Sequence, residues 1–251
     1  MRWYTPKDHD ASSPGPAVLH IHGGGMIALS VDLLNAMLKT YVQLTGVPIL
    51  AVDYRLAPEV QAPTPLKDCY AGLQWLVAHA AELGVDANRI AVMGESAGGG
   101  LAASLTHYAK VKRGPAICKQ ILIYPMLDDR TRSVDADTAP YLTWNVGDNI
   151  TGWSALLGDD AAGGPDVPAI HAAGRATVEE LRGLPPAYVD VGQLDLFRDE
   201  DLEYVRKLGQ AGVDVTFHLY PGVVHAFEVL APEAEVTGFA QEQRIKAIKG
   251  I

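Results

Sequence analysis

The stretch IAVMGESAGGG, residues 90–100, is the part of the chain that decides the fold. An apolar run, Ile90–Met93, leads directly into Gly94-Glu95-Ser96-Ala97-Gly98, and a helical pattern of small residues follows. A serine with a glycine two residues away on each side can occupy a tight strand-to-helix turn, because glycine tolerates the crowding there. The hydroxyl then stands clear of the sheet. The pentapeptide alone occurs by chance too often to establish a function, so its context matters.

A second motif and the overall pattern support this context. His22-Gly23-Gly24-Gly25 follows another apolar run, and short apolar runs alternate with longer helical patterns along the chain. Such alternation is typical of βαβ units and predicts an α/β fold with a mostly parallel sheet covered by helices on both faces. We expect strands at Ala17–Ile21, Ile49–Val52, Ile90–Met93, Ile121–Tyr124, Ala187–Val191 and Val213–Leu219. We expect helices at Leu66–Glu82, Ala97–Lys112, Asp199–Ala211 and Glu235–Lys249. The first should end at Gly84, because glycine is favoured at the position just after the last helical turn.

Length and composition fit a single α/β domain over residues 1–251. The chain is 48% hydrophobic and carries a formal net charge of −10. It can therefore bury a sizeable core without a metal or a disulfide, and its charge argues against a nucleic-acid or anionic-membrane partner. Cys69 and Cys118 are interpreted as small buried hydrophobic residues. No secretory signal occurs at residues 1–7 and no apolar stretch reaches the roughly 18 residues of a membrane helix, which predicts a cytoplasmic protein.

One segment departs from the alternation of strands and helices. From Asp128 to Arg182 the chain carries aromatic residues, short helical patterns and the turn cluster Gly163-Gly164-Pro165. It is too long for a connecting loop. We therefore expect an insertion that covers one end of the sheet as a partial cap.

The residues around Ser96 predict a serine nucleophile with a base and an acid. A neutral serine is a poor nucleophile and needs a base within hydrogen-bond reach, itself oriented by a third group. In the known group of hydrolases that present such a serine at a strand-to-helix turn, the acid and then the histidine come later in the chain. Asp195 follows the strand Ala187–Val191, and His225 follows the strand that ends at Leu219. We expect Ser96, Asp195 and His225 to form a catalytic triad.

Neighbouring acidic residues have structural interpretations. Asp190 lies inside a predicted strand and would point into the sheet. Asp199, Glu200 and Asp201 fall in the first turn of the next helix, where negative charge suits the helix dipole. Glu95 is expected to anchor the turn through hydrogen bonds, without a chemical role.

The other histidines near these motifs are also interpreted as structural. His20 and His218 lie within strands, and His22 is expected to hold its loop by side-chain hydrogen bonds.

The glycine triplet predicts an oxyanion hole. Attack on a carbonyl creates an oxyanion that needs preorganised donors. The backbone N–H of Ala97 is one donor, and Gly24 together with Gly25 or Gly23 supplies the others, because glycine lets the main chain approach closely. No clustered metal-ligand spacing is present, so no metal is expected.

With these residues in place, the chain resembles the bacterial hormone-sensitive-lipase-like esterases of the α/β-hydrolase superfamily (α/β-hydrolase fold-3). The resemblance covers nearly the whole chain, and Glu95 stands where that family more often has Asp. It implies an α/β-hydrolase fold, short-to-medium acyl esters as substrates, an acyl-enzyme intermediate and no cofactor. It also allows a homodimer through an edge strand or the C-terminal helix, and it implies that the family's N-terminal cap helices are absent. The matching motifs are HGGG at 22–25, DYRLAPE at 53–59, GESAGG at 94–99, LPP at 184–186, DLFRDE at 195–200 and HAF at 225–227.

Two alternatives stay open from the sequence. The same triad could cleave an amide or another acyl bond, since the difference lies in leaving-group protonation and pocket shape. A non-catalytic protein that binds a small molecule on the same fold is the other alternative, because fold alone does not fix function.

Overall fold

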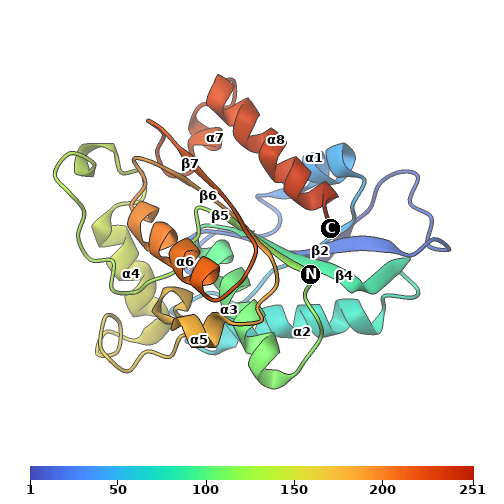
Figure 1. Cartoon of the computed structure of the whole chain (residues 1–251), viewed down its shortest axis with the longest axis horizontal. Coiled ribbons are helices and arrows are strands. Elements are labelled where there is room, and N and C mark those ends of the chain that lie inside the picture. Colours follow the sequence, from blue (N-terminus) through green and yellow to red (C-terminus); the bar gives the residue numbers. More distant parts are fainter.

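Seven strands form one sheet in the order β1-β3-β2-β4-β5-β6-β7 in the computed structural model, which describes residues 1–251 (Figure 1). β1 pairs antiparallel with β3, and every other neighbouring pair is parallel. The expected fold class, a mostly parallel α/β sheet, is confirmed. The strands are β1 Arg2–Tyr4, β2 Gly15–Ile21, β3 Ile49–Val52, β4 Val85–Glu95, β5 Lys119–Ile123, β6 Ala187–Gly192 and β7 Val215–Tyr220.

Helices cover both faces of the sheet. In Figure 1, α1, α7 and α8 lie above it, and α2, α3, α5 and α6 lie below it. Alternate strand residues point to opposite faces, so Leu19 belongs to the core under α2 and α3, and Val18 to the core under α1 and α8. Both faces of the sheet are therefore shielded from water, which explains why the strand segments are continuous apolar runs. The helices are α1 Asn35–Thr45, α2 Thr64–Ala78, α3 Ala97–Lys112, α4 Val146–Leu157, α5 Val178–Leu181, α6 Arg198–Gln210, α7 Phe227–Leu230 and α8 Glu235–Lys249.

The end of α2 differs from the expectation. The helix ends at Ala78, with His79 as its C-cap residue. The ring Nδ1–H of His79 donates to the carbonyl of Trp75 at 2.8 Å. Gly84 instead lies at the end of the turn that leads into β4, with φ +63°. A Cβ there would lie 2.5 Å from the Cα of Ala11, so the glycine is required by this contact and not by the helix end.

Three elements outside the insertion were not expected from the sequence: β1, α1 and the four-residue α7. β1 is only three residues long, too short to show a period. The helix α1 does carry a signal, because Leu38, Tyr41 and Val42 are its buried residues and follow helical spacing.

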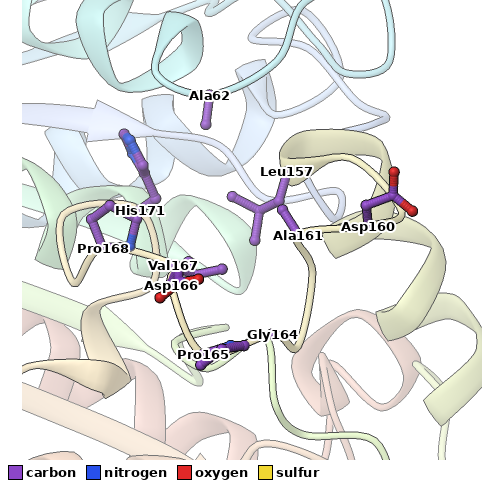
Figure 2. A pocket seen from close by; sticks show the side chains of 10 residues that line it. All are labelled: Ala62, Leu157, Asp160, Ala161, Gly164, Pro165, Asp166, Val167, Pro168 and His171. Carbon is purple, nitrogen blue, oxygen red and sulfur yellow. The ribbon is translucent and has the colours of Figure 1, made fainter.

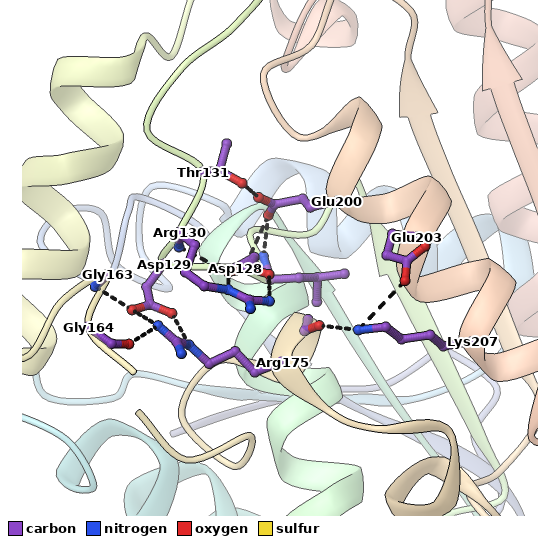
Figure 3. Close-up of polar contacts among 12 residues, drawn as sticks. Asp128, Asp129, Arg130, Thr131, Gly163, Gly164, Arg175, Glu200, Glu203 and Lys207 are labelled. Carbon is purple, nitrogen blue, oxygen red and sulfur yellow. Dashed lines mark hydrogen bonds and ion pairs between the residues drawn. The ribbon is translucent and has the colours of Figure 1, made fainter. Parts of the chain in front are cut away.

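The segment Asp128–Arg182 contains α4, α5 and two short 3-10 turns, Ala139–Tyr141 and Ala173–Arg175. Asp129 is fully buried and receives Nε–H and Nη2–H of Arg175 at 2.5 and 2.8 Å, as well as the backbone N–H of Gly163 at 2.6 Å (Figure 3). This ion pair connects the start of the insertion to its middle and its end. A cavity of about 410 Å³ lies between Leu157, Ala62 and His171 on this part of the molecule (Figure 2).

The connections after β2, β4, β6 and β7 all leave from the carboxyl ends of parallel strands. Such ends meet at one edge of the sheet, so Gly23, Ser96, Asp195 and His225 reach the same place. None of the helices combines the length and apolar character that a membrane crossing requires.

Candidate active site

Ser96 occupies a sharp turn between β4 and α3. Its φ is +55° and ψ is −121°, a backbone conformation that a non-glycine residue rarely adopts. The flanking glycines make room for the turn. A Cβ on Gly98 would lie 2.0 Å from the carbonyl oxygen of Ile21, and one on Gly94 would lie 2.3 Å from the carbonyl oxygen of Gly98. The two glycines therefore let α3 begin directly against the end of β2.

The structure brings the three predicted triad residues together. Ser96 Oγ lies 3.0 Å from His225 Nε2, and His225 Nδ1 lies 2.8 Å from Asp195 Oδ2. The other carboxylate oxygen, Oδ1, accepts the backbone N–H of Phe197 at 2.9 Å. All three side chains are nearly buried, Asp195 most completely. The arrangement can move a proton from the serine hydroxyl to the imidazole while the carboxylate holds the ring in orientation.

Neighbouring side chains fix the position of His225. The rings of Tyr124 and Phe197 contact its imidazole in edge-on arrangements, with centroids 4.6 and 5.1 Å away. Thr143, from the insertion, donates its hydroxyl hydrogen to the backbone carbonyl of His225 at 2.8 Å. The insertion therefore contributes directly to the site.

The glycine loop presents free backbone donors beside Ser96. The N–H groups of Gly23, Gly24 and Gly25 donate no backbone hydrogen bond, and Ala97 is the first residue of α3, where an N–H has no partner within the helix. Gly24 and Gly25 have φ of +99° and +61°, and a Cβ on Gly25 would lie 2.3 Å from the ring of Trp144. These groups are available to an oxyanion at the serine.

The residues after β3 hold the glycine loop. Tyr54 donates its hydroxyl hydrogen to the carbonyls of His22 and Gly23 at 2.9 and 3.3 Å, and its ring stacks on His22 at 4.2 Å. His22 Nδ1–H donates to the carbonyl of Gly23 at 2.8 Å, in agreement with its structural interpretation. Burial lowers the pKa of His22, which favours a neutral ring.

Glu95 anchors the turn from below. Its carboxylate oxygens lie 2.8 and 3.0 Å from Nε2 of His20, a fully buried histidine of β2. This pair joins β2 to β4 next to Ser96. The structural interpretations of Glu95 and His20 therefore agree with the contacts, although His20 Nδ1 has no partner.

A cavity of about 390 Å³ opens over Ser96. Its wall is mostly apolar, with side chains from residues 27–29 after the glycine loop, from α1, from the insertion and from α7. The lining residues include Leu29, Met37, Trp144, Tyr124, Glu228 and Val229. The cavity suits a small organic molecule whose carbonyl reaches Ser96.

Comparisons with known proteins agree with this geometry. The sequence profile of the α/β-hydrolase fold matches residues 18–229. The chain belongs to the α/β-hydrolase fold family. The hydrolase is 36% identical over 230 residues to Esterase LipI of Mycobacterium tuberculosis, a match that covers 90% of this chain and 70% of that protein. It is 33% identical over 244 residues to the Ethyl acetate hydrolase of Pseudomonas putida, again over 90% and 70%.

A solved structure is similar over almost the whole hydrolase. The Bacterial Heroin Esterase superposes with a TM-score of 0.91 at 37% identity, covering 99% of this chain and 78% of that one. The relatives are named esterases, carboxylesterases and lipases. The chain is therefore a hormone-sensitive-lipase-like hydrolase of the carboxylesterase and lipase type.

Several residues at the site of the hydrolase carry no sequence signal for it. Trp144 and Thr143 lie in the insertion, and Glu228 lies in the short helix after His225. Arg244 of α8 is 1% exposed, donates through Nε and Nη2 to Asp190 at 2.8 and 3.0 Å, and through Nη1 to Glu228 at 2.9 Å. A lone arginine in a helix of mostly polar residues looks like a surface residue. Only its position in the fold reveals that it is buried and bonded to two carboxylates.

The three acidic residues in the first turn of α6 differ in burial. Asp199 is exposed as expected, but Glu200 and Asp201 are buried. Glu200 Oε1 accepts the N–H groups of Leu127 and Asp128 at 2.6 and 3.2 Å, and its other oxygen accepts the hydroxyl of Thr131 (Figure 3). Burial raises the pKa of Glu200 to about 8 and also raises that of Asp201. All three acids lie in the first turn of α6 as expected, and the sequence did not show that tertiary contacts bury two of them.

The two cysteines are free. Cys69 is fully buried in the core as expected, whereas Cys118 is only half-buried.

Proposed function

We propose that this protein hydrolyses carboxylic esters with short-to-medium acyl chains through an acyl-enzyme formed on Ser96. The observation that carries the proposal is the continuous hydrogen-bonded relay from Ser96 Oγ through His225 to Asp195, with distances of 3.0 and 2.8 Å. A relay of this kind supplies a nucleophile, a base and an orienting acid in one line. The mostly apolar cavity above Ser96, of about 390 Å³, supports an acyl chain of limited length.

In the first half-reaction, Ser96 Oγ attacks the ester carbonyl while His225 Nε2 takes its proton. The carbonyl oxygen becomes an oxyanion, which accepts hydrogen bonds from the backbone N–H of Ala97 and from the glycine loop, Gly23, Gly24 and Gly25. His225 then gives the proton to the leaving alcohol, and the acyl group stays on Ser96. Asp195 accepts the Nδ1–H of His225 and stabilises the ring when it is protonated.

In the second half-reaction, a water molecule takes the place of the alcohol. His225 removes its proton, the hydroxide attacks the acyl carbonyl, and the same N–H groups hold the second oxyanion. Collapse releases the acid and returns the proton to Ser96. The reaction consumes one water per ester and requires no metal or cofactor.

The variant Ser96→Ala tests this proposal. We expect kcat for a 4-nitrophenyl ester to fall by at least about 10⁴-fold, as for other triad serines, while the circular dichroism spectrum and Tm stay close to wild type. A fluorophosphonate probe should label the wild-type protein covalently and leave the variant unlabelled. Wild-type turnover in the variant would reject the assignment, and a folded wild type that is never labelled would favour a binding protein.

A matched pair of substrates separates the ester from the amide alternative. An aryl ester and the corresponding aryl amide share the acyl group and differ in the leaving group, which is harder to expel from the amide. We expect the ester to be hydrolysed much faster.

Further proposals are that residues 1–251 act as one domain, that the protein is cytoplasmic, and that it forms a homodimer.

A further inference from the structure

The charges around the cavity over Ser96 are all of one sign. Glu95 and Glu228 line it together with His225, and no lysine or arginine does. Both carboxylate oxygens of Glu95 contact the ring of His20, whereas one oxygen of Glu228 has no partner, so Glu228 is the less satisfied of the two carboxylates. Acidic side chains are rarely buried unless they are paired, so a carboxylate in this mostly apolar wall is an informative feature.

Glu228 is only partly neutralised by its partners. Its Oε1 accepts Arg244 Nη1–H at 2.9 Å and the hydroxyl of Tyr124. Its Oε2 is buried and has no hydrogen-bond partner. Arg244 also forms two hydrogen bonds to the fully buried Asp190. One guanidinium therefore faces two carboxylates, and this buried group carries a formal net charge of −1.

The lining offers a second feature that suits an organic cation. Aromatic rings attract ammonium groups through their electron-rich faces. Tyr124 and Trp144 both line the cavity. Arg244 already lies 5.4 Å from the centroid of the Tyr124 ring, so Trp144 is the ring left for a ligand. Because Glu228 Oε2 lies beneath the cavity wall, its charge acts on a bound group through a region of low dielectric rather than by direct contact.

We propose that this site prefers esters that carry an ammonium group, with Glu228 as the residue that determines this preference. The inference rests on the proposed ester hydrolysis at Ser96 and names its substrate class. The acyl chemistry is the same as for a neutral ester. The cationic part of the substrate occupies the cavity between Trp144 and α7, and the negative charge of the Glu228 group stabilises it there.

Two esters of equal shape test the proposal. A choline ester and the 3,3-dimethylbutyl ester of the same acid differ only in N⁺ against C at the branched centre. For each ester, kcat/KM is divided by the rate constant for its hydrolysis by hydroxide. We expect this normalised value to be about tenfold larger for the choline ester. The variant Glu228→Gln keeps an oxygen that can accept from Tyr124 and Arg244 but removes the charge. It should lower the ratio of the two kcat/KM values by about tenfold relative to wild type.

The control is Glu233→Gln, which makes the same charge change at an exposed residue outside the cavity. Its ratio should equal that of wild type. An unchanged ratio in Glu228→Gln would overturn the proposal, and so would an equal fall in the control, which would point to the overall charge of the protein. Hydrolysis of the neutral ester reports the proposed function separately, because its absence in wild type would reject ester hydrolysis itself.

A measurement on the wild-type protein keeps the test independent of how the variant folds. Choline and 3,3-dimethylbutan-1-ol are the two alcohols of the same ester pair. As competitive inhibitors of 4-nitrophenyl acetate hydrolysis, they should differ by about tenfold in Ki, with choline the tighter. Equal or reversed Ki values would contradict a site for cations.

Discussion

At Gly98 a single methyl group is incompatible with the active-site turn. In Gly98→Ala the new Cβ would lie 2.0 Å from the carbonyl oxygen of Ile21 and 2.5 Å from that of His22. Both are backbone atoms, so β2 and the glycine loop have to move. We expect a loss of about 2–3 kcal/mol in the free energy of unfolding, together with a large fall in esterase activity.

The control for this change is Gly238→Ala in α8, where a Cβ meets nothing within 4 Å. Alanine has the higher helix propensity, so the control should be neutral or more stable by up to about 1 kcal/mol. Urea denaturation measures both variants. Equal stability of Gly98→Ala and the control would show that the turn is less constrained than its contacts indicate.

Glu200 makes the stability of the protein depend on pH. Burial raises its pKa in the folded state to about 8, from an ordinary value of 4.5. The unfolded chain therefore releases this proton at lower pH than the folded protein does. The contribution of Glu200 to the free energy of unfolding is present in full below pH 4.5. It is lost as the pH rises toward 8, by up to about 1.4 kcal/mol per pH unit.

The variant Glu200→Gln removes this titration while its amide oxygen can still accept from Leu127 and Asp128. We expect wild type to lose more stability than the variant between pH 5 and pH 8, as measured by urea denaturation at each pH. Glu200 also contributes to the raised pKa of Asp201, so the difference between the two proteins reports Glu200 together with its effect on Asp201. Parallel pH dependences would contradict the assignment of a raised pKa to this residue.

At the scale of elements, a buried ion pair contributes to holding the cap insertion in place. Asp129 is 1% exposed and is paired with Arg175. In Arg175→Met the carboxylate would stay buried without its cation, at a cost of about 3–5 kcal/mol in unfolding free energy. The control Arg182→Met removes an exposed pair with Glu179 and should cost no more than about 0.5 kcal/mol. Similar losses in the two variants would show that the buried pair does not hold the insertion.

Most elements with strong patterns were predicted, but α1 was missed although its buried residues follow helical spacing, and short elements such as β1 were missed as well. The apolar runs gave six of the seven strands because central parallel strands are apolar on both faces. The three-residue β1 is held only by its pairing with β3, and no local pattern shows it. The end of α2 was misplaced because Gly84 serves a close contact with Ala11, a residue far away in sequence.

For the whole molecule, we expect one cooperative unfolding transition. Trp153 and Leu156 of the insertion belong to the same core cluster as Leu19 of β2 and Leu122 of β5. An insertion that shares its core with the sheet should unfold with it. Tryptophan fluorescence, far-ultraviolet circular dichroism and esterase activity should give the same urea midpoint. An earlier loss of one signal would indicate that the insertion unfolds as a separate unit.

The sequence by itself determined the α/β class and predicted the turn at Ser96, because the apolar runs of strands and glycine at a crowded turn are local properties of the chain. The roles of Asp195 and His225 remain a proposal, which their hydrogen-bond distances to each other and to Ser96 support. Only the tertiary structure decided which side chains surround that site. Arg244, Glu228, Trp144 and Thr143 come from separate elements, and packing alone brings them together. Burial also gives Glu200 its raised pKa, since the cost of removing a charge from water depends on the neighbours that exclude it.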